Sequence, residues 1–343
     1  MVAFNLLPAF LLPFWYPIAL KNEIEPGKLY RRVVDGVPFT LYKHHHQGYR
    51  MIHDACPHQG ASLSAGRLDT NSTVVCPYHA FRFRNGCFCG MPSNLQGGQQ
   101  PTLFLSNISV LRLLLTEDSD IIYARPDINL NVQVKPRSSP PFQPTEEFDR
   151  RFSKITGCSP IDCEADAVTE NVLDMLHISF IHGFGNLESP MPLRVKHRKT
   201  SNVSGVTTFH YRSGPTSLSR IMENATTVVV ENEYHLPSTT VTRVTAGSLV
   251  KTVVTRALRV EDGKTLLFWT VYRNFWNGNS LMQVMGDYMM RMLMERTIEE
   301  DKAILKHVYV DKRFGTIETV YDQTILAFRK AKKQFMGGED SPE

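Results

Sequence analysis

The motif Cys56-Pro57-His58 and the motif Cys76-Pro77-Tyr78-His79 decide how the first part of this chain folds. Together they read C-x-H-x17-C-x-x-H, so each motif contributes one cysteine and one histidine. Proline follows each cysteine, which fixes the backbone φ angle and removes an amide donor beside the sulfur. Two thiolates and two imidazoles on separate loops indicate a metal site.

Two kinds of metal site use these ligands. A structural zinc site is the first, but it usually takes both cysteines from one knuckle and both histidines from another. A Rieske [2Fe–2S] cluster is the second, because two histidines there replace two cysteines on one of its irons. Each iron then needs one ligand from each loop, as the crossed pattern provides. The sequence favours the Rieske cluster, with Cys56 and Cys76 on the inner iron and His58 and His79 on the outer iron.

A second group of possible ligands lies in the segment Asn171-x-x-Asp174-x-x-His177-x4-His182. Two histidines with one carboxylate form the facial triad of non-haem Fe(II) oxygenases, which leaves metal positions open. On an ideal helix the two histidines would lie about 140° apart, so they converge only if the helix loosens, for which the glycines that follow offer a place. Alone, the motif would describe an ordinary helix. Beside a Rieske pair, it predicts mononuclear iron bound by His177 and His182.

Helix geometry selects the third ligand of that iron. The stretch 280–310 is typical of a helix with an apolar stripe. The neighbours of Asp301 at three and four residues are mostly apolar, those of Glu299 are mostly polar, and Glu300 lies between. Because an unpaired carboxylate in an apolar face is costly, we expect Asp301 to bind the metal, with Glu300 as the alternative. The predicted stripe consists of Met282, Met285, Met289, Leu293, Met294, Ile298, Ile304 and Leu305.

The chain has 343 residues, of which 42% are hydrophobic, so we expect two domains. Short β-like runs over 14–125 predict an antiparallel β domain, and prolines mark 126–147 as a linker. Longer alternating runs over 148–335, with helices before and after them, predict an antiparallel sheet covered on one face, which makes the fold α+β. The turn signals of the first domain are Asp35-Gly36, Asn85-Gly86 and Gly97-Gly98. The long runs of the second are 206–211, 226–236, 239–246, 250–260 and 265–272.

Charge and cysteine usage limit the partners and the compartment. The net charge of +4 is too small to indicate nucleic acid; it mildly favours an acidic electron donor or has no consequence. The four remaining cysteines do not form a disulfide framework, which predicts a reducing compartment: the cytoplasm, or an organelle stroma or matrix if a transit peptide has been removed. The first twenty residues are apolar but contain three prolines and no basic segment, so we expect neither a signal peptide nor a transmembrane segment.

With these residues in view, the chain resembles the oxygenase components of Rieske non-haem iron oxygenases, in particular the single-subunit group of dicamba and vanillate O-demethylases and saxitoxin-pathway hydroxylases. The resemblance begins at Phe14-Trp15-Tyr16-Pro17 and includes the stretch Glu299-Glu300-Asp301-Lys302, where that group carries its third-ligand aspartate. The chain departs from the family pattern at Gln59, where arginine is usual, and at Ala80-Phe81, where Gly-Trp is usual. None of these is a ligand, so the departures concern cluster potential and donor docking.

The resemblance implies a Rieske domain followed by a helix-grip, START-like catalytic domain. It also implies a homotrimer, in which Asp174 bridges His177 of one subunit and the Rieske His79 of its neighbour, with Asn171 near that path. The implied reaction is a mono- or dioxygenation: O2 and externally supplied electrons hydroxylate, demethylate or otherwise oxidise a small, cyclic organic substrate. A separate ferredoxin or flavin reductase would supply the electrons, because the sequence contains no G-x-G-x-x-G fingerprint.

Two alternatives remain open. One is oxidation of a larger pigment or sterol-like substrate, as in the chlorophyllide oxygenase branch. The other is a non-catalytic Rieske electron carrier or partner subunit, although such a protein would lack the second domain or part of the triad. Apolar residues that could line a substrate pocket, or could equally belong to the core, are Met222, Trp269, Phe275, Trp276, Met289 and Met290.

Overall fold

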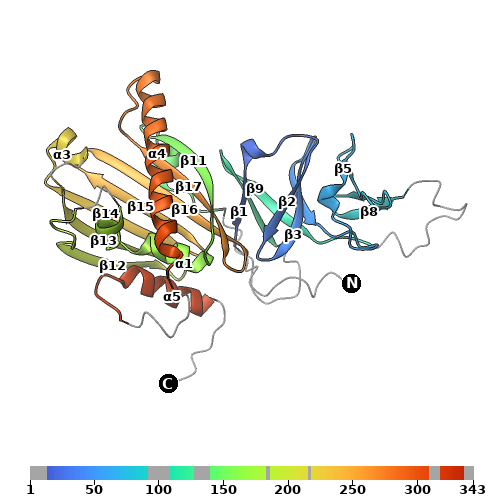
Figure 1. The fold of residues 1–343 in the computed structure, drawn as a ribbon. Coiled ribbons are helices and arrows are strands. Elements are labelled where there is room, and N and C mark those ends of the chain that lie inside the picture. Colours follow the sequence, from blue (N-terminus) through green and yellow to red (C-terminus); the bar gives the residue numbers. More distant parts are fainter. Residues whose placement is uncertain are drawn as a thin grey trace, which may run out of the picture. The chain divides into compact units, whose positions relative to one another are not determined.

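The computed structural model describes residues 14–91, 108–126, 140–182, 186–214, 218–308 and 317–335. The chain divides into two compact units, Met1–Pro141 and Phe142–Glu343 (Figure 1). The boundaries 14–125, 126–147 and 148–335 stay predictions, because much of the linker lies outside the described residues.

The first unit consists of two antiparallel sheets, a six-stranded one in the order β1-β10-β9-β4-β3-β2 and a four-stranded one in the order β5-β6-β7-β8. Two predicted turns are confirmed: Asp35-Gly36 and Asn85-Gly86 both have positive φ angles, which a tight hairpin turn requires. Gly97-Gly98 lies outside the described residues. The elements are β1 (Tyr16–Leu20), η2 (Lys21–Glu23), β2 (Leu29–Val34), β3 (Val37–His44), β4 (Gly48–His53), η3 (Leu63–Ala65), β5 (Arg67–Leu68), β6 (Val74–Val75), β7 (Arg82–Arg84), β8 (Cys87–Gly90), β9 (Arg112–Glu117) and β10 (Ile121–Pro126).

The second unit is a seven-stranded antiparallel sheet in the order β11-β17-β16-β15-β14-β13-β12 with helices packed on it. In Figure 1, α4 crosses one face of the sheet. The α+β class is confirmed, and the run predicted at 239–246 has the bounds of β15. The elements are η6 (Thr145–Phe148), β11 (Ser153–Ile161), α1 (Ala165–Leu173), α2 (Ile178–Ile181), β12 (Arg194–Ser201), β13 (Ser204–Arg212), α3 (Leu218–Glu223), β14 (Thr227–His235), β15 (Thr239–Ala246), β16 (Leu249–Glu261), β17 (Lys264–Arg273), α4 (Ser280–Leu305) and α5 (Gln323–Phe335).

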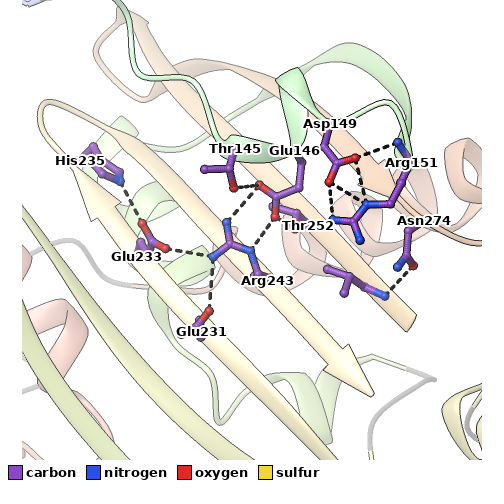
Figure 2. A network of polar contacts seen from close by, with 11 residues as sticks. Thr145, Glu146, Asp149, Arg151, Glu231, Glu233, His235, Arg243, Thr252 and Asn274 are labelled. Atoms are coloured by element: carbon purple, nitrogen blue, oxygen red, sulfur yellow. Dashed lines mark hydrogen bonds and ion pairs between the residues drawn. The ribbon is translucent and has the colours of Figure 1, made fainter. Parts of the chain in front are cut away.

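Alternation along the strands separates the two faces of this sheet. Thr242 and Val244 of β15 line a cavity on one face, so Arg243 between them points to the other. There its Nε donates to Glu146 Oε1 at 2.6 Å, and the Thr252 hydroxyl donates to the same oxygen at 2.7 Å (Figure 2). Burial would raise the pKa of Glu146, but these donors lower it. The charged network therefore attaches η6 to the sheet.

The apolar stripe predicted on α4 is wrong for Met282, Met285, Met289 and Ile304, which are exposed. The buried positions are Gly286, Met290, Ile298 and Leu305. The reason lies in Arg273 of β17, whose buried guanidinium occupies the space next to Gly286: a Cβ on that glycine would lie 2.6 Å from Arg273 Nη2. The glycine must face the sheet, and this fixes the rotation of the helix.

Within the described ranges, no helix has the length and hydropathy needed to cross a membrane.

Candidate metal centres

Two loops of the first unit carry the four predicted cluster ligands and share one backbone conformation. In each loop the cysteine N–H donates to the carbonyl five residues later, and the cysteine carbonyl accepts from the amide four residues later, at 2.8 to 3.1 Å. The residues at that fourth position, Gly60 and Ala80, both have left-handed backbones, with φ of 75° and 57°. The chain thus presents Cys56 and Cys76 in two equivalent turns.

The ligand atoms lie at graded depth. Cys56 and Cys76 are both 2% exposed, whereas His58 is exposed and His79 is half-buried. The Nδ1 atoms of the two imidazoles lie 3.2 Å apart. Burial raises the pKa of Cys56, and the neighbouring Cys76 raises it further, so a bound cation is needed to keep the Cys56 thiol ionised. The arrangement suits an inner iron held by sulfur and an outer iron held by nitrogen.

The same four residues do not fit a single zinc ion. In the described part of the chain, one group of three or more His, Cys, Asp or Glu side chains has ligand atoms within 4.8 Å of one another, and it contains none of these four. A tetrahedral zinc site needs all its ligands around one point.

A buried carboxylate supports the first of the two loops. Asp54 accepts hydrogen bonds from the Thr40 hydroxyl at 2.5 Å, the Ser62 hydroxyl at 2.5 Å and the Ser64 amide at 2.7 Å. Burial would raise the pKa of Asp54, but the hydrogen bonds more than offset it and the pKa is lowered. One ionised group before the turn therefore binds the segment that follows it and attaches both to β3.

The converging group in the second unit is His177, His182 and Asp301. Asp301 Oδ1 lies 3.4 Å from His177 Nε2 and 3.4 Å from His182 Nε2, and the two nitrogens are 3.2 Å apart. This carboxylate oxygen is buried and has no hydrogen-bond partner among the described residues. The side chain of Glu299 is 70% exposed, against 15% for Asp301. Two imidazole nitrogens and an unbonded carboxylate oxygen around one point suit a divalent metal.

The two histidines converge because the helix between them is a single turn. His177 caps α2 with a helical backbone, and His182 leaves the helix with φ of −93° and ψ of 136°. The change of direction thus falls on His182 itself; Gly183 and Gly185, predicted to allow it, lie outside the described residues. Upstream, the buried Asn232 of β14 donates to the carbonyls of Val172 and Leu173 at the end of α1. This anchors the segment that leads to His177.

Each imidazole also has a carboxylate on its far side. Glu300 Oε2 lies 3.0 Å from His182 Nδ1, and its other oxygen accepts from Arg296 Nε at 2.9 Å. Asp174 Oδ2 lies 3.8 Å from His177 Nδ1, while its Oδ1 accepts the Leu176 amide at 2.8 Å. Glu300, the alternative third ligand, thus orients His182 from behind, a role that sequence reasoning missed. Spacing along the helix gave no signal for it, because its partner comes from another element.

Asn171 lies in the last turn of α1, where its carbonyl accepts the Asp174 amide at 3.2 Å. It is not among the described residues that line the cavity at the metal group. A role for Asn171 near the iron stays a prediction.

The metal group opens into a cavity of about 740 Å³ between the sheet and α4. Of the six predicted pocket residues, Phe275 and Met290 line it. Trp269 lies in the core and Trp276 packs against it, whereas Met222 and Met289 are exposed. Sequence reasoning missed Lys251 of β16, which lines the cavity together with its neighbours in the alternating pattern. A lysine within an apolar alternating run was the signal that could have found it.

Known proteins match both units. Residues 14–98 match the Rieske [2Fe-2S] domain, and residues 161–336 match the vanillate O-demethylase oxygenase C-terminal domain. Pheophorbide a oxygenase from Oryza sativa subsp. japonica is 25% identical over 198 residues, 56% of this chain and 37% of that protein. The chain therefore spans about a third of the length of this curated relative. Ferredoxin CarAc from Metapseudomonas resinovorans is 37% identical over 82 residues, 23% of this chain and 72% of that protein.

A solved structure resembles most of the chain in fold. The crystal structure of dicamba monooxygenase bound to dicamba superposes with a TM-score of 0.75 at 18% identity, covering 95% of this chain and 98% of that one. The Rieske and C-terminal oxygenase domains bind a [2Fe–2S] cluster and a mononuclear iron. The C-terminal domain alone covers half of the sequence, and with the Rieske domain before it the chain belongs to the Rieske non-haem iron oxygenases of the vanillate O-demethylase type.

Proposed function

We propose that this protein is an oxygenase that uses O2 and externally supplied electrons to oxidise an organic substrate in the cavity beside α4. Cys56 and Cys76 hold the inner iron of its Rieske cluster, and His58 and His79 hold the outer iron. The support is the graded burial of the ligands, with sulfur inside and nitrogen at the surface. An exposed imidazole edge gives an electron donor access to the cluster.

In the second unit, His177, His182 and Asp301 hold the mononuclear iron. The observation that carries this assignment is the buried Asp301 Oδ1, which has no hydrogen-bond partner among the described residues and faces two imidazole nitrogens. When bound, the iron supplies open positions at which O2 is reduced next to the substrate. Glu300 keeps His182 in the ligating orientation, and the largely apolar cavity limits water around the reacting groups.

The reaction balances as substrate C–H, O2, two electrons and two protons giving C–OH and water. Hydroxylation of an O- or N-methyl group by this reaction leads to demethylation; insertion of both oxygen atoms would make the enzyme a dioxygenase. The electrons come from a separate ferredoxin or flavin reductase. Two observations favour a separate donor: the sequence has no G-x-G-x-x-G fingerprint, and family members of the Rieske type depend on external electrons.

In this proposal, electrons pass between the subunits of a ring of three. Asp174 lies behind His177 and keeps 35% of its side chain exposed, so it can reach a histidine such as His79 of a neighbouring subunit. Head-to-tail contacts of this kind close into rings. Asp174→Asn should leave both metal sites filled and slow product formation severely. A protein that is monomeric in analytical ultracentrifugation and fully active in turnover would contradict the ring.

The substrate is a small cyclic molecule or a larger pigment or sterol-like one. The cavity volume of about 740 Å³ lies in the upper part of the range for ligand pockets. It therefore favours the pigment or sterol-like substrate as a second candidate. The similarity to pheophorbide a oxygenase points the same way. None of the six cysteines, all of which lie within the described residues, forms a disulfide, which supports a reducing compartment, either the cytoplasm or an organelle stroma or matrix.

The test is anaerobic purification followed by metal analysis and electron paramagnetic resonance. We expect about three iron atoms per chain, two in the cluster and one mononuclear, and a Rieske signal on reduction. A surrogate reductase with O2 and a panel of cyclic compounds should then give an oxidised product detected by mass spectrometry. A colourless protein that holds one zinc per chain would refute the proposal. A reducible cluster without any mononuclear iron would favour the electron-carrier alternative.

A further inference from the structure

Lys251 is a charged residue in the wall of an apolar cavity. It belongs to β16, where Leu249 and Val253 on either side of it in the alternation line the same cavity. Lys251 is half-buried, and because its side of the strand is the cavity side, the surface that it retains faces the cavity. Burial lowers the pKa of its ammonium group, so a negative charge bound next to it would stabilise its charged form.

Arg273 and Arg212 are the two other cationic side chains to compare with Lys251. Arg273 of β17, opposite Lys251 in the register, donates to Asp287 Oδ1 at 2.6 Å and to the Gln283 carbonyl at 3.0 Å. Arg212 also lines the cavity but is exposed. Besides the predicted metal ligands, Lys251 is the one charged side chain among the described lining residues that is not exposed.

The cavity separates Lys251 from the metal group. Arg273 fixes the Lys251 end of the cavity to Asp287 of α4, whereas the metal group lies at Asp301 near the other end of the same helix. At 1.5 Å per residue, Asp287 and Asp301 are about 21 Å apart along the axis. The side chains of Lys251 and of the metal group both extend into the cavity, which shortens this distance. A ligand that contacts both Lys251 and the metal would therefore span on the order of 10 Å or more.

Building on the proposed oxygenase function, we propose that Lys251 binds a carboxylate at one end of the substrate. The substrate is then an elongated, otherwise apolar molecule, oxidised at the end remote from its anionic group. A charge-assisted hydrogen bond in this apolar setting holds the carboxylate more strongly than it would in water. It also sets which carbon reaches the iron, because the anchor fixes one end of the molecule and the cavity walls fix its direction.

A pair of probes of equal shape tests this: biphenyl-4-carboxylate and the uncharged biphenyl-4-methanol. Their dissociation constants are measured by isothermal titration calorimetry on the iron-loaded protein. The wild type should prefer the carboxylate. Lys251→Met, which keeps the length of the side chain, should weaken carboxylate binding by about tenfold to a hundredfold and leave the alcohol unchanged. Lys251→Arg should restore much of the preference. Lys199→Met, which removes an exposed charge of β12 in the same sheet, should change neither constant.

Equal binding of the two probes by the wild type would overturn the proposal. So would carboxylate binding that survives Lys251→Met, as it would if the anion bound at the iron. The calorimetric experiment measures binding without turnover, so its outcome is independent of the test of the oxygenase function. Absence of the Rieske signal or of catalysis would refute the oxygenase function, and the two probes would still decide whether Lys251 binds a carboxylate.

Discussion

The two proposed metal centres differ in how far apart the chain keeps their candidate ligands. The Rieske loops take all four ligands from the stretch 56–79, and each loop is a short turn with its own hydrogen bonds. The second centre takes two ligands from the ends of α2 and the third from α4. Strands β12 to β17 lie between these two helices in the sequence. A local turn specifies its site by itself, whereas a site assembled from distant elements depends on the packing of every element between them.

The largest expected effect removes one centre and spares the other. Asp301→Ala should lose the mononuclear iron and all turnover while the Rieske signal persists, because the cluster ligands lie in the other unit. Cys76→Ser should abolish the Rieske signal. As a control, Glu299→Ala removes an exposed carboxylate and should change stability by no more than about 0.5 kcal/mol. If the iron survives Asp301→Ala at saturating metal but not Glu300→Ala, the choice of Asp301 is wrong.

The catalytic unit should also depend on the charged network of Arg243 and Glu146, on the face of the sheet opposite the cavity. Arg243→Met leaves the buried Glu146 carboxylate without its cation (Figure 2) and should destabilise the catalytic unit by about 3–5 kcal/mol in chemical denaturation. The Rieske signal should be unaffected.

The pH dependence of the Arg243→Met defect follows from Glu146. In the wild type its pKa is lowered, so its contribution is complete above the ordinary glutamate range and is lost as the pH falls through the lowered value. In the variant, burial without Arg243 should raise the pKa, so the defect should be largest at neutral pH and shrink on acidification. Arg151→Met, which removes an exposed partner of Asp149, is the control. A defect that does not change with pH would contradict the role given to Glu146.

A smaller effect concerns the residue behind a ligand. Glu300→Ala should weaken iron binding by roughly 10- to 100-fold, as is usual for loss of a partner that orients a metal-binding histidine, and should leave full occupancy at saturating iron. Metal titration against a competing chelator measures this. Glu295→Ala, an exposed position one turn earlier on α4, should bind iron as the wild type does. Equal affinities in the two variants would show that Glu300 does not orient His182.

The same contrast explains what the sequence could predict. Spacing and alternation predicted β15 and the two hairpin turns, which the structure confirms, because each depends on residues close in sequence. The ligand set of the Rieske loops rests on spacing of the same kind and stays a prediction. On α4, Ile298 and Leu305 beside Asp301 are buried as predicted, whereas in the first half of the helix Gly286 and Met290 are buried in place of Met285 and Met289. The rotation of that helix depends on Arg273 and Gly286, a contact between elements that no periodicity shows. Glu300 and Lys251 were missed for the same reason.

The smallest expected effect tests the equivalence of the two Rieske loops. Gly60 and Ala80 occupy the same left-handed position, but only glycine adopts it without a steric cost, which is about 1–2 kcal/mol for other residues. Ala80→Gly should therefore stabilise the Rieske unit by about 1 kcal/mol, since the added freedom of the unfolded chain offsets part of the gain. Gly60→Ala should destabilise it by a similar amount, because a Cβ there meets no atom within 4 Å and the backbone alone decides the result. Thermal loss of the cluster's visible absorbance measures both. If the two substitutions shift the midpoint in the same direction, the loops are not equivalent, and the alanine is accommodated by contacts that the first loop lacks.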